Sequence, residues 1–369
     1  MTDVSGASAA HHGSATPDGR PFTRSDLIVL GGCVLGVAAA GITRYVNLGS
    51  VTAFVCAAVA VALLASLVGR SVEQLGDRFG PGATGVLQSA LGNLPELFIG
   101  YFALRSGLLA VVQAAIIGSI LSNVLLVLGA AFIVGGLRHG TQRFSAGSVR
   151  TTCSLLVLAV AALVLPSLAS YVHTPAAGHE TGLSVAVAIV LLVVFALSLP
   201  ASLRRDPQAP VVQGEPPRWP LWLAVGMLVL ASVAAALVSD WFVTALTPAM
   251  DALNISDAFA GLVVVAIASN AIENVVGIQL AARNQADYAL SVIINSPLQV
   301  ALVLAPVLVL LSLLTATTLT LVFAPMLVVA TAIAVIGVTF VVLDGESNWL
   351  EGVSLVALYA IIASSFWWG

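Results

Sequence analysis

The chain has 369 residues, of which 59% are hydrophobic and only 8% are charged, with a mean hydropathy of +1.07. Soluble globular domains carry about 25% charged residues, so this composition excludes a soluble fold and indicates an integral membrane protein. The net charge of −4 does not favour binding to nucleic acid. We therefore expect the lipid bilayer as a partner and no nucleic acid.

Apolar stretches of the roughly 20 residues that a helix needs to cross a bilayer recur along the chain. The polar first 25 residues lack the order of a cleaved signal and are expected to form a disordered cytoplasmic tail. The expected fold is all-α, with about 11 transmembrane helices. Their predicted spans are residues 27–43, 51–69, 83–104, 108–134, 148–168, 182–200, 219–238, 258–282, 287–313, 320–342 and 349–367.

Arginine placement predicts the orientation of these spans. The sequence contains no lysine, so its 13 basic residues are all arginine. With the N-terminus in the cytoplasm, Arg44 and Arg105 lie outside and the other 11 lie on the cytoplasmic side. Because basic residues favour that side, the sequence predicts a cytoplasmic N-terminus and a C-terminus outside. The lysine-free composition favours a bacterial inner membrane as the location.

An internal duplication relates "LGNLPELFIG" to "ASNAIENVVG". The first segment carries Asn93 and Glu96, and the second carries Asn270 and Glu273, 177 positions later in both cases. Paired Asn and Glu at one offset are not expected by chance in an apolar sequence. Five predicted spans separate the copies, and because five is odd the second copy crosses the membrane in the opposite direction. Secondary transporters use this inverted repeat to build alternating access.

The duplication predicts how the chain is divided. A tail at residues 1–25 precedes transmembrane helix 1 at residues 26–47, which lies outside the repeat. Two inverted five-helix repeats follow, separated by a polar, proline-rich cytoplasmic linker. The first repeat is expected at residues 48–205, the linker at 206–218 and the second repeat at 219–369.

Polar side chains recur at a spacing of three in both copies, which places the two members of each pair on one face of a helix. A carboxylate inside the membrane is costly and indicates a functional site by default. The pairs are Asn93 with Glu96, Ser119 with Ser122, Asn270 with Glu273, and Ser296 with Gln299. Weak points in the helices, whose freed carbonyls could act as ligands, are expected at Gly92, Pro95, Gly118 and Pro297.

These side chains favour a hard cation. Ca²⁺ takes about six to eight oxygen ligands, and here they are supplied by two carboxylates, amides, hydroxyls and backbone carbonyls. A zinc site is not expected, because every histidine lies in the tail or loops and the cysteines stand singly in apolar spans. No resident cofactor is expected. The predicted oxygen ligands are Glu96, Glu273, Asn93, Asn270, Ser119, Ser296 and Gln299.

Two segments of the chain resemble the two alpha-repeats of calcium/proton exchangers, within the calcium/cation antiporter superfamily. They are "GNLPELFIGYFALRSGLLAVVQAAIIGSILSNVLLVLG" and "SNAIENVVGIQLAARNQADYALSVIINSPLQVALVLAPVLVLLS". The resemblance implies that Glu96 and Glu273 are the paired carboxylates shared by cation and proton. Gln113 and Ser122 belong to the first motif and are further candidates. The implied activity is antiport of a cation, Ca²⁺ first, against protons.

The second repeat departs from the family pattern. Where the family usually has GNxxEH, this chain has Ser269 and Asn274, and where it usually has a Gly-Ser pair in the ninth helix, this chain has Asn295 followed by Ser296 and Pro297. Asn274 and Asn295 are therefore candidate selectivity residues. A Na⁺ or K⁺ exchanger on the same scaffold stays open as the alternative.

Other interpretations have specific requirements. A structural role for the two glutamates would need a cationic partner, and no arginine lies within the central spans. Ser122, Asn123 and Asn274 are equally well explained by hydrogen bonds between helices. An enzyme is not expected, because no nucleophile with a base and no HExxH motif appears. A cation channel would use similar polar residues, but a duplication with opposed topology favours a transporter. A homo-oligomer is left open.

Overall fold

The computed structural model describes residues 22–46, 48–76, 78, 87–88, 90–203 and 218–368. Most of the predicted tail, nearly all of the predicted linker and the start of the predicted third span lie outside these residues. The described part is almost entirely helical. Its helices are α1 (Arg24–Val46), α2 (Ser50–Gly76), α4 (Leu94–Arg105), α5 (Leu109–Leu121), α6 (Leu128–His139), α7 (Ala146–Tyr171), α8 (Glu180–Leu203), α9 (Leu221–Leu253), α10 (Asp257–Phe259), α11 (Ala266–Ser269), α12 (Ala271–Ala282), α13 (Ala286–Gln299), α14 (Ala305–Ser312), α15 (Pro325–Val342) and α16 (Trp349–Ser365).

Three π-helical segments and one small sheet complete the described part of the chain. The π-helices are η1 (Ser122–Val127), η2 (Ala260–Val265) and η3 (Val300–Leu304), and each continues directly from an α-helix. Strands β1 (Gln142–Arg143) and β2 (Glu346–Ser347) pair antiparallel and join the α6–α7 connection to the α15–α16 connection.

Within the described residues, eight helices are long and apolar enough to cross a membrane. A ninth span is formed if Asp257–Ser269 and Asn274–Ala282, which are bent by 61°, count as one. The chain is therefore an integral membrane protein. The number of 11 crossings stays a prediction, because α16 and α4 are shorter than a full span, with 17 and 12 residues.

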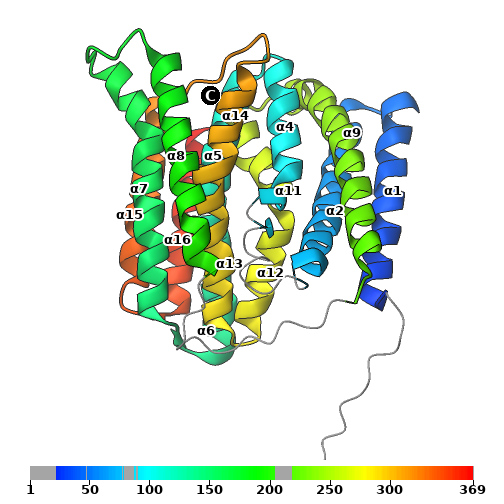
Figure 1. The fold of residues 1–369 in the computed structure, drawn as a ribbon, viewed down its shortest axis with the longest axis horizontal. Helices are drawn as coiled ribbons and strands as arrows, with labels where there is room; N and C mark the ends of the chain where they lie inside the picture. The colour runs from blue at the N-terminus through cyan, green and yellow to red at the C-terminus, as the bar shows by residue number, and fades with distance from the viewer. Residues whose placement is uncertain are drawn as a thin grey trace, which may run out of the picture.

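The helices form three groups (Figure 1). Helices α1, α2 and α9 pack against one another on one side of the bundle, and α7, α8 and α15 lie on the other. Between them stand α4, α5, α11, α12, α13 and α14. Helix α4 lies in the upper half of the view and α12 in the lower half, so the two short helices leave the middle of the bundle toward opposite ends.

The backbone repeats the duplication seen in the sequence. Asn93 precedes α4 with φ −93° and ψ 18°, and Asn270 precedes α12 with φ −96° and ψ 14°. The helices also end alike, at Gly107 (φ +78°) and at Asn284 (φ +61°), which is again 177 positions later. The two segments therefore share their local structure from the break before the helix to the turn after it.

Two predicted helix boundaries differ from the structure. Helix α9 extends 15 residues beyond the predicted end, to Leu253. The predicted tenth helix begins at Pro325 and not at residue 320, because residues 318–324 are not helical. The side chains of Leu319, Leu321 and Phe323 are fully buried in this extended segment. Its backbone is held by hydroxyls of neighbouring helices, such as Ser167, which donates to Leu321 O and accepts from Phe323 N.

Two predicted weak points are not breaks. Helix α5 continues through Gly118, and α13 continues through Pro297. The regular α-helical pattern changes three or four residues later, where η1 and η3 begin. Hydrogen bonds to the fifth preceding residue let a helix widen without unwinding, and such segments often lie at functional sites.

Candidate functional site

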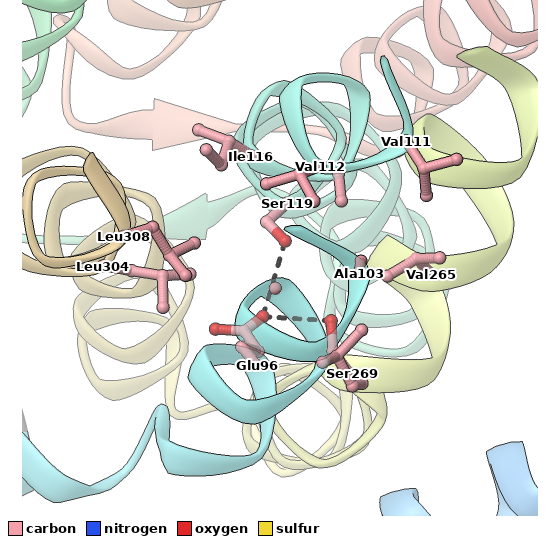
Figure 2. Close-up of a pocket in the computed structure, with 13 residues that line it drawn as sticks. Glu96, Ala103, Val111, Val112, Ile116, Ser119, Val265, Ser269, Leu304 and Leu308 are labelled. Carbon is pink, nitrogen blue, oxygen red and sulfur yellow. Dashed lines mark hydrogen bonds between the residues drawn. The ribbon is translucent and has the colours of Figure 1, made fainter. Parts of the chain in front are cut away.

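Glu96 is the centre of a buried polar cluster. Its side chain, in the first turn of α4, is 8% exposed. Its Oε1 accepts hydrogen bonds from Asn270 Nδ2 at 2.6 Å, Ser269 Oγ at 3.1 Å and Ser119 Oγ at 3.4 Å, the last two drawn in Figure 2. Ser119 comes from α5 in the first repeat, and the other two donors stand at the break before α12. The cluster therefore joins side chains from both copies of the duplication.

A second layer of buried polar groups supports these donors. Asn123 Nδ2 donates to Ser119 O at 2.9 Å and to Asn270 Oδ1 at 3.1 Å. Ser296 Oγ donates to the same Asn270 Oδ1 at 3.4 Å, and Ser122 Oγ donates to Ser119 O at 3.3 Å. Each of these side chains is at most 5% exposed. In such surroundings a hydrogen bond resists competition from water and holds its partners in a defined geometry.

Close backbone approach between α5 and η2 brings the two repeats together at this cluster. A Cβ atom added at Gly118 would lie 2.3 Å from Leu262 O, and one added at Gly261 would lie 2.3 Å from Val111 O. Any side chain at either position would force the helices apart. Gly118 directly precedes Ser119, so the same contact places that hydroxyl beside the break at Asn270.

A cavity of about 980 Å³ reaches Glu96 from one end of the bundle. We call it the vestibule. Asn93, Pro95, Glu96 and Ser269 line its inner part, and at its mouth Arg70 pairs with Asp26 at 2.8 Å. By the predicted orientation this end is cytoplasmic. The vestibule connects the carboxylate to that end of the bundle.

The opposite side of Glu96 is closed by apolar side chains. A cavity of about 30 Å³ lies there, between Leu304 and Leu308 on one side and Val111, Val112 and Ile116 on the other (Figure 2). We call these five residues the apolar layer. The space could hold a water molecule but no hydrated cation. Among the described residues, Glu96 thus has the large vestibule on one side and only this small apolar space on the other.

The structure places several predicted site residues away from the cluster. Gln113 donates to Thr320 O at 2.9 Å and to Val322 O at 3.0 Å, which fastens α5 to the extended segment before α15. Gln299 is half-buried at the end of α13 and takes no part in the described hydrogen bonds around Glu96. Gln113 thus has a structural partner that the motif alone did not reveal.

The remaining predicted residues take no part in the hydrogen bonds that the structure describes in the cluster. The backbone of Glu273 is in the first turn of α12, and its side chain lies outside what the structure describes. Asn93 lines the vestibule, and its buried Nδ2 has no partner among the described residues. Asn274 Oδ1 is also buried without a described partner, whereas Asn295 Nδ2 donates to Ser291 Oγ at 3.3 Å.

Two members of the cluster, Ser269 and Asn123, are not among the predicted site residues. Ser269 stands 177 positions after Gly92 and was noticed only as a departure from the family pattern. Asn123 follows Ser119 by four positions, a spacing that places both on one helical face, but a bond between helices explained it equally well. The contact between Asn123 and Asn270 joins the two repeats, and no pattern within one repeat reveals it.

The chain is similar to proteins of a known family. The model of the family described as "Sodium/calcium exchanger protein" matches residues 49–203 and 223–368. The chain belongs to this family. The predicted resemblance to its calcium/proton exchangers is confirmed by relatives named "Ca(2+)/H(+) antiporter". The protein is thus a membrane transporter, and below we call it the exchanger.

Two curated relatives span almost the same length as the exchanger. The Ca(2+)/H(+) antiporter of Synechocystis sp. is 35% identical over 366 residues, which cover 92% of this chain and 96% of that relative. The Ca(2+)/H(+) antiporter ChaA of Bacillus subtilis is 34% identical over 323 residues, which cover 86% of this chain and 92% of that relative.

Solved structures show the same fold. The structure of native YfkE is 32% identical, with a TM-score of 0.79, and covers 92% of the exchanger and 99% of that chain. The H+/Ca2+ exchanger CAX has a TM-score of 0.74 at 16% identity, over 94% of the exchanger and 92% of that chain. At that identity the second likeness concerns the fold alone.

Proposed function

We propose that the exchanger moves Ca²⁺ in one direction and protons in the other, with Glu96 and Glu273 as the carboxylates that both ions use. The observation that carries this proposal is the position of Glu96. Its carboxylate is buried, receives donors from both repeats, and lies where an open vestibule meets the closed apolar layer. A carboxylate that meets one aqueous side at a time is what an alternating-access carrier needs.

The chemistry around Glu96 suits a hard cation. The carboxylate is accompanied by the hydroxyl oxygens of Ser119 and Ser269, and Ala266 O lies within 2.9 Å of the neighbouring amide of Asn270. Oxygen ligands of mixed charge are those that Ca²⁺ binds. In this proposal Glu273, the counterpart of Glu96 in the second repeat, supplies a second carboxylate and water completes the shell.

Competition for these carboxylates couples the two ions. Two carboxylates close together in a site of low dielectric constant do not both remain charged when no cation is present, so the empty site binds at least one proton. Because a cation needs deprotonated ligands, Ca²⁺ binding releases protons to the side that the site then faces. In a bacterial inner membrane the proton gradient would drive Ca²⁺ out of the cytoplasm.

Alternating access follows from the inverted repeats in this proposal. The backbone around Asn93 and around Asn270 is the same, and α4 and α12 run toward opposite ends of the bundle, which supports an arrangement of two equivalent halves. The state described here is open toward the predicted cytoplasmic end. The opposite state would close the vestibule and separate Leu304 and Leu308 from Val111 and Val112.

Inside-out membrane vesicles test the transported ion. Vesicles carrying the exchanger and a proton gradient, acidic inside, receive Ca²⁺, Na⁺, K⁺ or Mn²⁺ separately while the lumenal pH is followed. Collapse of the gradient by Ca²⁺ alone is the expected result. Collapse by Na⁺ or K⁺ alone would establish the monovalent exchanger instead, and flux that does not saturate and needs no counter-ion would establish a channel.

A further inference from the structure

The nitrogen of Asn270 has more acceptors than it can use. Four oxygen atoms lie within 3.2 Å of Nδ2: Glu96 Oε1 at 2.6 Å, Ala266 O at 2.9 Å, Ser119 Oγ at 3.0 Å and Ser269 Oγ at 3.2 Å. An amide nitrogen carries two hydrogens. Several oxygens that converge on one point could form part of a hard-cation shell, so in the proposed site the amide nitrogen stands where the cation would lie.

Asn123 reinforces the orientation in which the nitrogen of the Asn270 amide points at these oxygens. Its side chain is fully buried, and its Nδ2 donates at 2.9 Å to Ser119 O, one helical turn earlier. The same nitrogen donates to Asn270 Oδ1 at 3.1 Å. Because an amide nitrogen cannot accept a hydrogen bond, this contact keeps the oxygen of Asn270 on the far side and its N–H group toward Glu96.

We propose that Asn123 is a positioning residue that holds the Asn270 amide in the place of the cation when the site is empty. This inference rests on the proposed Ca²⁺ site. To offer its oxygen to a cation, the Asn270 amide has to turn, and its nitrogen then faces the nitrogen of Asn123. Two donors facing each other oppose that turn. Asn123 therefore weakens Ca²⁺ binding and favours release.

The second nearby donor does not impose the same orientation. Ser296 Oγ lies 3.4 Å from Asn270 Oδ1, and a hydroxyl can rotate to accept from a turned amide. Asn123 has a buried Oδ1 with no partner among the described residues, which could accept from the turned amide only if the bond to Ser119 O is given up. The amide of Asn123 thus selects one orientation of Asn270, and the hydroxyl of Ser296 accepts both.

Calorimetric titration of the purified, detergent-solubilised exchanger with Ca²⁺ tests this role. Asn123→Leu removes the donor and keeps a similar volume, so we expect the Kd for Ca²⁺ to fall about tenfold, the size of one hydrogen bond. A gain in affinity is informative because damage to packing does not produce it. Unchanged or weaker binding by folded Asn123→Leu would overturn the inference.

Two further variants make the test specific. Ser296→Ala is the matched control and should not tighten binding; tightening equal to that of Asn123→Leu would overturn the selective role of Asn123. In an Asn270→Ser background the effect of Asn123→Leu should vanish, whereas a persisting gain would show that Asn123 does not act through Asn270.

If Asn123→Leu does not fold, Asn123→Ser is expected to shift the Kd in the same direction. A wild type that binds no Ca²⁺ would overturn the proposed function as well, whereas normal binding by both the wild type and the variants would overturn only this inference.

Discussion

The breaks before α4 and α12 have the same backbone and different side-chain bonding. Asn93 and Asn270 differ by only a few degrees in φ and ψ. Asn270 Nδ2 nevertheless meets four oxygens, including Glu96 Oε1, while the buried Nδ2 of Asn93 has no partner among the described residues. The repeated sequence thus determines the local backbone, while the side-chain bonds of the two breaks differ in the described structure.

This asymmetry is what alternating access between inverted halves requires. With the vestibule open beside Asn93, the break of the second repeat packs against Glu96 and the apolar layer closes the other side. In the opposite state we expect the roles to exchange, with Asn93 bonded at the site and Asn270 exposed to water. If the proposal holds, changes at the two breaks should affect transport and stability in ways that reflect this difference.

The largest effect is expected when either break loses its carboxylate. Glu96→Gln and Glu273→Gln keep the size of the side chain but remove its negative charge and its ability to exchange a proton. Each variant should reduce Ca²⁺-driven proton movement in inside-out vesicles to the level of vesicles without the exchanger. Size-exclusion chromatography of the detergent extract checks folding. Exchange at the wild-type rate by either variant, at matched expression, would contradict the two-carboxylate site.

The next largest effect is a difference in protein stability between variants of Asn270 and Asn93. In Ca²⁺-free detergent, Asn270→Ala should lower the free energy of unfolding by about 1–3 kcal/mol, because it removes the 2.6 Å hydrogen bond to Glu96 Oε1 and one of the two acceptors of Asn123 Nδ2 from a buried cluster. Asn93→Ala removes a side-chain nitrogen that has no described partner and should change stability by less than about 0.5 kcal/mol.

The stability of both asparagine variants is measured by thermal unfolding, followed by tryptophan fluorescence. Ion exchange in vesicles should be impaired in both variants. Equal destabilisation by the two changes would show that the asymmetry of the described state does not persist in solution.

The sequence predicted members of the polar cluster where spacing and the offset between the repeats carry the signal. The common offset found Glu96, Asn270, Ser119 and Ser296, and the structure places these four side chains in one cluster. Apolar composition also located most of the helices. These features depend on spacing and hydropathy, which a single sequence contains.

The features that sequence analysis missed depend on contacts between distant segments. Gln113 bonds Thr320 O, 207 positions away, in a segment whose apolar character predicted a helix. Leu319, Leu321 and Phe323 alternate as in an extended chain, but in so apolar a sequence this alternation is hidden among other apolar residues. The π-helices likewise follow from packing at the site and have no composition of their own.

A smaller effect is expected at Ser269, which stands in the second break where the first break has Gly92. Ser269→Gly gives the second break the residue that Gly92 provides in the first, and it removes the hydroxyl that donates to Glu96 Oε1 at 3.1 Å. The Kd for Ca²⁺ should rise about three- to tenfold, the effect of losing one hydroxyl oxygen beside the carboxylate.

Ser269→Thr keeps the hydroxyl and is the matched control, with a Kd near that of the wild type. If glycine and threonine have the same effect, the hydroxyl contributes nothing to the site and the difference between the breaks is one of packing.

The smallest effect is expected from the two selectivity candidates, because neither takes part in the described hydrogen bonds around Glu96. Asn295 lies 177 positions after Gly118, and its amide bonds Ser291 instead of leaving room for close backbone approach. Asn274 follows Glu273 directly, and its Oδ1 is buried without a described partner. Their influence on the ion is therefore indirect, through the packing of α12 and α13.

The double change Asn274→His with Asn295→Gly tests that influence. It adds an imidazole beside Glu273 and leaves α13 room for the close backbone approach that Gly118 permits in α5, so we expect preference to move toward Ca²⁺. The ratio of apparent affinities for Ca²⁺ and Na⁺, measured in vesicles under one proton gradient, should rise about two- to fivefold, less than the loss of a whole hydrogen bond. A ratio that stays at the wild-type value in an active variant would show that the two amides only bond or pack between helices. The difference between the repeats that matters for ion choice would then lie at Ser269, directly beside the carboxylate, and not one helical layer away.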